Sequence, residues 1–311
     1  MMTNGQPDVR GTAQRPEITH QEAQRPDVQQ PDVQRAVQRA RHAASQARLA
    51  AEARAQRDKL RETLVREMFA RPVRDCAHRS LGRPVRVLRA GALTPLEELG
   101  LSQLRDRGYE VTVVTVDQPG LWTPPAHASG GNHGPGGDVR LGDLRAVPLP
   151  PRSFDIVHCA LLLDRIRHVE LVLDRLIAAL RPGGFLLLRI RDRDCAFGLL
   201  DRWLPRPARR RLRARIDPAA AGRRGPFSSF PAVYEKTASD RGIQEYARMR
   251  GLFVTQRETT RTWPEDPDRL ARTVAATCRL VARLTRGRLT DAHDEVLYVI
   301  RRPEERFARV V

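Results

Sequence analysis

Two aspartates follow stretches of β-branched and aliphatic residues, where carboxylates can bind a ligand. Asp117 directly follows the stretch 111–116, and Asp143 lies at the end of the stretch 138–144. If both stretches are parallel strands, their carboxyl ends lie at one edge of a sheet, where open α/β sheets bind ligands. A carboxylate at such a strand end accepts hydrogen bonds from both hydroxyls of a ribose. Without a ligand, Asp117 simply starts a turn before Pro119, and Asp143 is an ordinary loop carboxylate.

The elements that must position these aspartates alternate between strands and helices. The segment Thr94-Pro95-Leu96-Glu97 predicts a helix start with a cap, a proline at the first helical position and a capping-box glutamate, and this helix is expected to run to Arg107. Strands that alternate with helices indicate a parallel sheet covered on both faces. The expected strands are 85–90, 111–116, 138–144, 154–162, 185–190, 252–258 and 295–301, and the later expected helices are 169–180, 239–250 and one within 267–284.

The predicted fold class is therefore α/β. We expect a Rossmann-like doubly wound, mostly parallel seven-stranded sheet with helices on both faces, preceded by a long N-terminal helix. The final strand–helix–strand passage, from 252 to 301, is expected to close the sheet with an antiparallel edge.

Composition divides the chain into three parts. Residues 1–34 are rich in Gln, Pro and Asp and carry one aliphatic residue per short repeated phrase, which predicts a disordered tail. Residues 35–80 are rich in Ala, Arg, Gln and Glu and predict a helical extension, with its strongest apolar stripe at Leu60, Leu64, Val65 and Met68. Residues 81–311 are expected to form the Rossmann-like domain, interrupted by an Arg/Pro-rich insertion at about 196–236.

One composite phrase resembles the class I S-adenosylmethionine-dependent methyltransferases. It consists of Gly142-Asp143-Leu144, Pro148-Leu149-Pro150, Ser153-Phe154-Asp155-Ile156-Val157 and Leu180-Arg181-Pro182-Gly183-Gly184-Phe185. The resemblance extends loosely over residues 84–303, and implies methyl transfer with S-adenosylmethionine as cofactor. It places Asp117 at the ribose, Asp143 at the adenine amino group and the backbone of Cys159 beside the methionine part. The full set of cofactor-binding residues that we expect is Ala90, Gly91, Asp117, Gln118, Asp143, Leu144 and Cys159.

The first loop departs from the family's V-L-D-x-G-x-G-x-G pattern. This chain reads Val87-Leu88-Arg89-Ala90-Gly91-Ala92-Leu93-Thr94-Pro95, so only the first glycine, Gly91, is kept. Leu93 adds a side chain where the backbone approaches the cofactor, and Pro95 removes an N–H from the helix terminus. Arg89 reverses the sign of the family's charge, although a guanidinium can pair with the methionine carboxylate instead.

Three functions stay open on this sequence. The first is a methyltransferase for a small-molecule or metabolite acceptor. The second is a methyltransferase-like domain without cofactor binding that acts as an interaction or regulatory module. The third is an RNA-directed methyltransferase or RNA-binding protein that uses the Arg-rich insertion.

Little of the catalytic machinery can be assigned to residues. Methyl transfer depends chiefly on holding the acceptor in line, so no catalytic triad is expected. His158 lies in a strand predicted to be buried, and we interpret it as a hydrogen-bonded core histidine rather than a base. The stretch 226–234 mixes aromatic side chains, hydroxyls and prolines, and its Phe230 and Tyr234 are expected to cover the acceptor pocket.

Composition limits the other possibilities. The 311 residues carry a formal charge of +18, and all but two of the 55 basic residues are arginines. The densest run, 209–215, can neutralise phosphates, but without interleaved aromatics it also fits a solvated helix face.

No apolar stretch reaches the ~20 residues that cross a bilayer, and no signal core is seen, so a cytoplasmic protein is expected. The four cysteines lie far apart, which predicts buried free thiols and no metal site.

Overall fold

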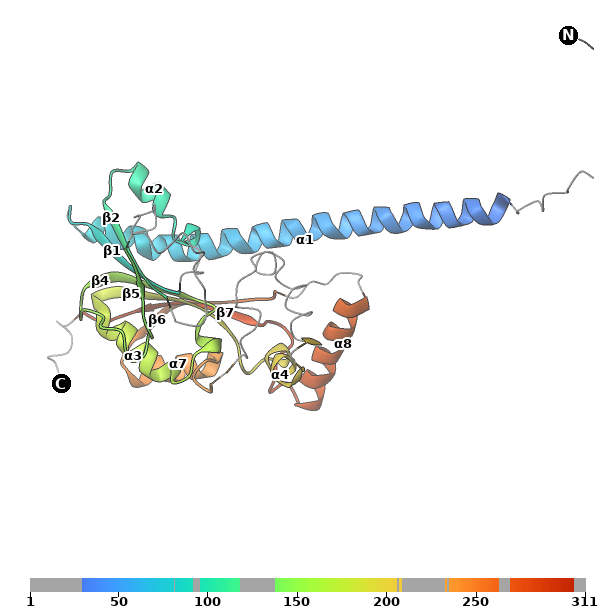
Figure 1. The fold of residues 1–311 in the computed structure, drawn as a ribbon. Helices are drawn as coiled ribbons and strands as arrows, with labels where there is room; N and C mark the ends of the chain where they lie inside the picture. Colours follow the sequence, from blue (N-terminus) through green and yellow to red (C-terminus); the bar gives the residue numbers. More distant parts are fainter. Residues whose placement is uncertain are drawn as a thin grey trace, which may run out of the picture. The chain divides into compact units, whose positions relative to one another are not determined.

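The computed structural model describes residues 30–80, 82–91, 96–117, 138–205, 207–208, 233, 235–262 and 269–304 (Figure 1). The tail at 1–29, the expected loop at 119–137 and the Arg-rich run lie outside these residues. The chain divides into two compact units, Met1–Arg48 and Leu49–Val311. In the first unit, the described side chains from Arg35 to Arg48 are all exposed and belong to a helix.

The second unit is built on one seven-stranded sheet with the order β3-β2-β1-β4-β5-β7-β6. Strands β3, β2, β1, β4 and β5 run parallel, while β7 is antiparallel to both β5 and β6. This topology confirms the predicted Rossmann-like fold class. The strands are β1 (Val85–Ala90), β2 (Val111–Asp117), β3 (Asp138–Leu141), β4 (Phe154–Ala160), β5 (Leu180–Arg191), β6 (Phe253–Thr260) and β7 (Glu295–Arg301).

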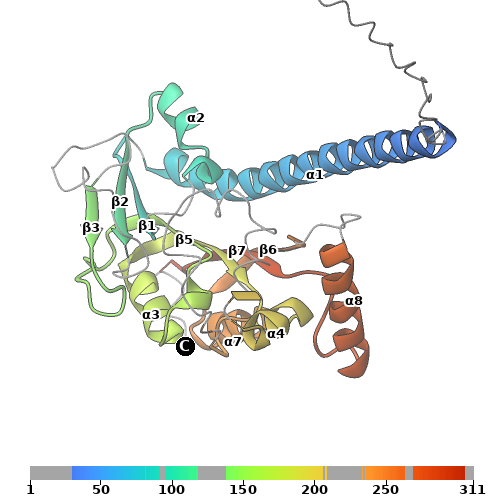
Figure 2. The same cartoon turned by 45° about the vertical axis from the view of Figure 1, so that its right-hand side comes forward.

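Two apolar clusters cover the two faces of the sheet. On one face, helices α3 (Val169–Ala179) and α7 (Asp240–Met249) pack on strand residues such as Leu88 and Leu188. On the other face, the end of α1 (Gln30–Arg79) and the short helix α2 (Leu101–Asp106) pack on residues such as Val87. Figures 1 and 2 show these two layers of helices on either side of the strands. The remaining α-helices in the described residues are α4 (Ala196–Trp203) and α8 (Arg269–Leu284), which pack on each other around Phe197 and Cys278.

The last turns of α1 dock on the sheet because their apolar residues recur at helical spacing. Val65, Phe69 and Val73 are fully buried, and each such side chain contributes about 1.5–3 kcal/mol of transfer free energy. The predicted apolar stripe was only half right, because Val65 is buried while Leu60 is 64% exposed. Neither α1 nor any other helix in the described part of the chain is long and apolar enough to span a membrane.

The predicted helix from Thr94 to Arg107 is replaced by two shorter pieces. A 3-10 turn, η1 (Glu97–Leu99), is followed by Gly100 and then by α2. Gly100 has a φ of 61°, which is left-handed and interrupts the helix. A Cβ atom on Gly100 would lie 3.1 Å from the Cβ of Ala70 in α1, so this glycine also permits close packing of the two elements.

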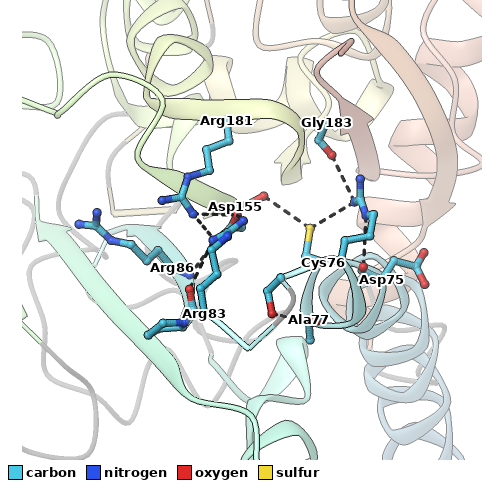
Figure 3. Close-up of polar contacts among 11 residues, drawn as sticks. Asp75, Cys76, Ala77, Arg83, Arg86, Asp155, Arg181 and Gly183 are labelled. Atoms are coloured by element: carbon cyan, nitrogen blue, oxygen red, sulfur yellow. Dashed lines mark hydrogen bonds and ion pairs between the residues drawn. The ribbon is translucent and has the colours of Figure 1, made fainter. Parts of the chain in front are cut away.

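The amino-terminal edge of the sheet is held together by Asp155 of β4 (Figure 3). Its carboxylate accepts hydrogen bonds from the guanidinium of Arg83 at 2.9 and 2.6 Å, from Nη1 of Arg181 at 3.1 and 3.0 Å, and from the amide of Arg86 at 2.9 Å. Burial acts to raise the pKa of Asp155, but these hydrogen bonds outweigh it and hold the pKa below its ordinary value. Beside it, Arg79 at the end of α1 donates to the carbonyl oxygen of Gly183 at 3.3 Å. Asp155 therefore has a structural role at the edge opposite to the expected ligand site.

Candidate active site

The carboxyl ends of β1, β2 and β4 meet where the strand order reverses. Ala90, the last residue of β1, is in register with Val116 of β2 on one side and with Cys159 of β4 on the other. The N–H of Gly91 donates to the carbonyl oxygen of Val116 at 2.8 Å. Doubly wound sheets bind ligands at such a reversal. The structure therefore brings Ala90, Gly91 and Cys159, which were predicted from separate motifs, to one place.

Gly91 needs to be a glycine in this conformation. Its φ is 93°, a region that side chains with a Cβ rarely adopt, and the residue is buried. The first family glycine thus keeps its conformational role, although the rest of the pattern has changed. The changed positions 92–95 lie outside the described residues.

Asp117 is the last residue of β2, in register with Leu141 of β3. Its backbone therefore lies one residue beyond Val116, which accepts the hydrogen bond from Gly91. Its side chain and the whole of Gln118 lie outside the described part of the chain.

Asp143 lies in a compact turn after β3. Its carboxylate accepts hydrogen bonds from Nε and Nη2 of Arg145 and from the Arg145 amide, while its carbonyl oxygen accepts from Val147 at 2.6 Å. The adjacent Leu144 is fully buried and anchors the turn in the core. A bound adenine amino group would therefore share the Asp143 carboxylate with Arg145.

A buried ion network that the sequence did not predict lies on the α1 face of the sheet. Glu98 accepts a hydrogen bond from Nη1 of Arg189 in β5. Nε of Arg189 donates to Glu295 of β7 at 3.1 Å, and Arg61 of α1 donates to the same carboxylate oxygen at 3.2 Å. Burial acts to raise the pKa of Glu295, but the surrounding arginines outweigh it and lower this pKa. The network ties α1 and the turn after β1 to the carboxyl half of the sheet.

His158 is buried beside this network, as expected for a core histidine, but it is not hydrogen bonded. Its Nε2 lies 3.5 Å from a carboxylate oxygen of Glu98, and neither ring nitrogen has a hydrogen bond with any described residue. The ring packs edge-on against Phe69 with 5.4 Å between centroids. Burial lowers the pKa of His158 more than Glu98 raises it, so the imidazole is neutral.

The end of β4 carries a buried cysteine, and the turn after it carries a buried aspartate. Burial, with the charge of Asp164 as a second cause, raises the pKa of Cys159 to about 12, so this thiol is protonated at neutral pH. Asp164 lies in the turn η2 (Leu163–Arg165) and has no exposed surface. Its carbonyl oxygen accepts a hydrogen bond from the amide of Val233 at 2.8 Å, so the end of the insertion lies beside η2.

A second contact ties the insertion to the same segment. The Glu235 carboxylate accepts hydrogen bonds from the amides of His168 and Val169 at 2.6 and 2.9 Å, and thereby caps the start of α3. Phe230 and Tyr234, the predicted cover of the acceptor pocket, lie outside the described residues.

An adenosyl cofactor fits the described residues at this edge. Gly91 offers backbone without a side chain, Ala90 beside it is small, and β2 ends in the carboxylate-bearing Asp117. These are the features that a nucleoside ligand requires where the order of a doubly wound sheet reverses. The fold and this edge together are of the kind that binds a ligand containing a nucleoside.

Comparison with known proteins supports the methyltransferase class predicted from the sequence. Residues 97–188 match a family model described as a methyltransferase domain. This match confirms the predicted resemblance to S-adenosylmethionine-dependent methyltransferases, with S-adenosylmethionine as the cofactor of the class. The match begins after the altered loop, at Glu97, and therefore does not include β1 or Gly91. No curated protein matches the chain.

Several solved structures are similar at low sequence identity. An S-adenosylmethionine-dependent methyltransferase from Mesorhizobium loti is 17% identical with a TM-score of 0.40, and the match covers 71% of this chain and 92% of that one. A methyltransferase from Archaeoglobus fulgidus is 12% identical with a TM-score of 0.42, and the match covers 78% of this chain and 94% of that one. A loganic acid methyltransferase solved with S-adenosylhomocysteine is 9% identical with a TM-score of 0.45, and the match covers 78% of this chain and 94% of that one.

Proposed function

We propose that this protein transfers a methyl group from S-adenosylmethionine to a small-molecule acceptor. The observation that carries the proposal is the convergence of Ala90, Gly91 and Cys159 at the reversal of strand order, with Asp117 ending the neighbouring strand. The proposed cofactor-binding residues are those predicted from the sequence, namely Ala90, Gly91, Asp117, Gln118, Asp143, Leu144 and Cys159.

The roles of these residues follow from their chemistry. The cofactor supplies an electrophilic methyl group. Asp117 is proposed to accept the ribose hydroxyls, and the backbone around Gly91 to approach the cofactor without a side chain between them. Cys159 is proposed to line the methionine part of the cofactor through its shape and its backbone. Its thiol is protonated at neutral pH and takes no part in the chemistry. Rate acceleration in such a site comes mainly from orientation and the exclusion of water.

The end of the insertion is proposed to cover the acceptor. The hydrogen bond from Val233 to Asp164 and the cap that Glu235 provides to α3 support this idea, because both join the end of the insertion to the segment that follows β4. Phe230 and Tyr234 flank Val233 in the sequence and are the side chains proposed to contact the acceptor.

Calorimetric titration with S-adenosylhomocysteine tests the cofactor site directly. We expect binding by the wild-type chain, loss of roughly tenfold or more in affinity for Asp117→Ala, and no change for Asp106→Ala. Asp106 is a suitable control because it is an exposed aspartate at the end of α2. A folded wild-type protein that does not bind would refute the proposal.

One observation favours a second candidate, a methyltransferase-like module that does not bind the cofactor. The family match starts only at Glu97, and the strand before it carries the basic residue Arg89, next to its last residue, where the family carries an acid. The same titration separates the two functions. The arginine run 209–215, on which an RNA-directed function depends, lies outside the described residues.

A further inference from the structure

The carboxylate of Asp164 differs from the other buried carboxylates. It has no exposed surface, and neither of its oxygens accepts a hydrogen bond from a residue that the structure describes. Arg165 forms an ion pair with this carboxylate, but its Nε lies 3.7 Å from Oδ2, which is outside hydrogen-bond reach. In contrast, Asp155 is held by two guanidinium groups, and Asp294 accepts hydrogen bonds from the amide and hydroxyl of Thr262.

The position of Asp164 coincides with the ligand edge of the sheet. Asp164 follows β4 by four residues, and its charge contributes to the raised pKa of Cys159 at the end of that strand. The chain that returns from the insertion contacts its backbone through Val233. A buried charge without hydrogen bonds is costly, and such groups in folded proteins call for a partner.

We propose that Asp164 binds the methyl acceptor and that the acceptor is an amine. This inference rests on the proposed methyltransferase function and adds the class of its substrate. Two carboxylate oxygens without hydrogen bonds can receive two N–H donors from one amine, whereas a hydroxyl has a single donor and leaves one oxygen unpaired. A hydrogen-bonded amine therefore satisfies this site more completely than an alcohol.

The charge of Asp164 also suits the reaction. The amine nitrogen uses its lone pair to form a bond to the methyl carbon, whose bond to sulfur breaks with the electron pair staying on sulfur. The positive charge thereby passes from sulfur to nitrogen, where a neighbouring carboxylate stabilises it. A proton then leaves the methylated nitrogen, either to the Asp164 carboxylate or to water.

The first experiment compares the thermal unfolding of Asp164→Asn with that of Asp155→Asn. Removal of a buried charge that accepts no hydrogen bond is expected to leave the Tm of the Asp164 variant unchanged or higher, while the Asp155 variant loses stability. If Asp164→Asn is destabilised as strongly as Asp155→Asn, the carboxylate has a structural role and the proposal is overturned.

The second experiment compares how amines and alcohols change the Tm of the protein when it is saturated with S-adenosylhomocysteine. Ethylamine and benzylamine hydrochlorides are added at constant ionic strength, and ethanol and benzyl alcohol serve as matched probes. We expect the amines alone to raise the Tm of the wild-type protein, and Asp164→Asn to require roughly tenfold or more of each amine for the same rise. A rise that persists in the variant, one seen with the alcohols alone, or no rise with either amine would overturn the proposal.

A titration separates this proposal from the proposed function. Asp164→Asn is expected to bind S-adenosylhomocysteine as the wild type does. If the wild type itself does not bind it, the proposed function fails; if both bind it and the amines have no effect, only the role of Asp164 fails.

Discussion

The substitution Asp155→Asn is expected to destabilise the protein strongly without touching the ligand edge. Asp155 is 4% exposed, and its carboxylate accepts hydrogen bonds from two guanidinium groups and one backbone amide. Hydrogen bonds to charged groups contribute about 1.5–3 kcal/mol each. The side chains of Arg83 and Arg181 are 43% and 30% exposed and regain water in the variant, which reduces the loss. We therefore expect a net loss of about 3 kcal/mol rather than the full sum.

Differential scanning calorimetry measures this loss as a fall in Tm. For a domain of this size, 1 kcal/mol corresponds to about 2–4 °C, so the expected fall is about 6–12 °C. The exposed Asp106→Asn is the matched control and is expected to change stability by less than about 0.5 kcal/mol. A fall in Tm for Asp155→Asn no larger than that of the control would refute the assignment of this carboxylate as the anchor of the amino-terminal edge.

The same variant carries a pH signature. Because the folded-state pKa of Asp155 lies below its ordinary value, its stabilising contribution is present above about pH 4 and disappears as the pH falls through the folded-state pKa. The difference in Tm between wild type and variant is therefore expected to be constant near neutral pH and to shrink in acid. A difference that stays constant down to acid unfolding would contradict the electrostatic origin.

Three further predictions concern the core and the thiols. Glu98→Gln leaves the buried guanidinium of Arg189 with one carboxylate fewer and is expected to cost about 2–3 kcal/mol in urea unfolding; an unchanged midpoint would mean that the network contributes nothing. Gly184→Ala would place a Cβ 2.8 Å from the carbonyl oxygen of Asp155 and is expected to lower the free energy of unfolding by about 1–3 kcal/mol in the same assay. An unchanged free energy of unfolding would show that β4 and β5 can move apart at little cost. All four cysteines are buried and free, so iodoacetamide is expected to label them only after unfolding in guanidinium; mass-spectrometric detection of label on Cys159 in the native protein would contradict its burial and its raised pKa.

Local sequence was sufficient for the strands and for the order in which they occur. The predicted limits 85–90 and 295–301 agree with β1 and β7, because runs of β-branched and aliphatic residues favour extended backbone wherever they are packed. The interrupted helix after β1 was missed for a physical reason. Gly100 is left-handed where it meets Ala70, a residue of α1 that lies far away in the sequence.

The class of ligand edge was also predictable, because the motifs that flank each strand determine which residues reach its carboxyl end. Strand order then brings Ala90 and Cys159 into register, and this pairing follows from the fold that the motifs indicate.

Which charged side chains near this edge are buried was decided only by the tertiary structure. Glu98 is partly buried in an ion network while its neighbour Glu97 is exposed, and no spacing in the sequence distinguishes them. Asp164 resembles any loop aspartate until the chain that returns at Val233 lies against it. The sequence determines which side chains carry charge, but packing from distant segments removes their water, and the loss of water gives a buried carboxylate its need for a partner.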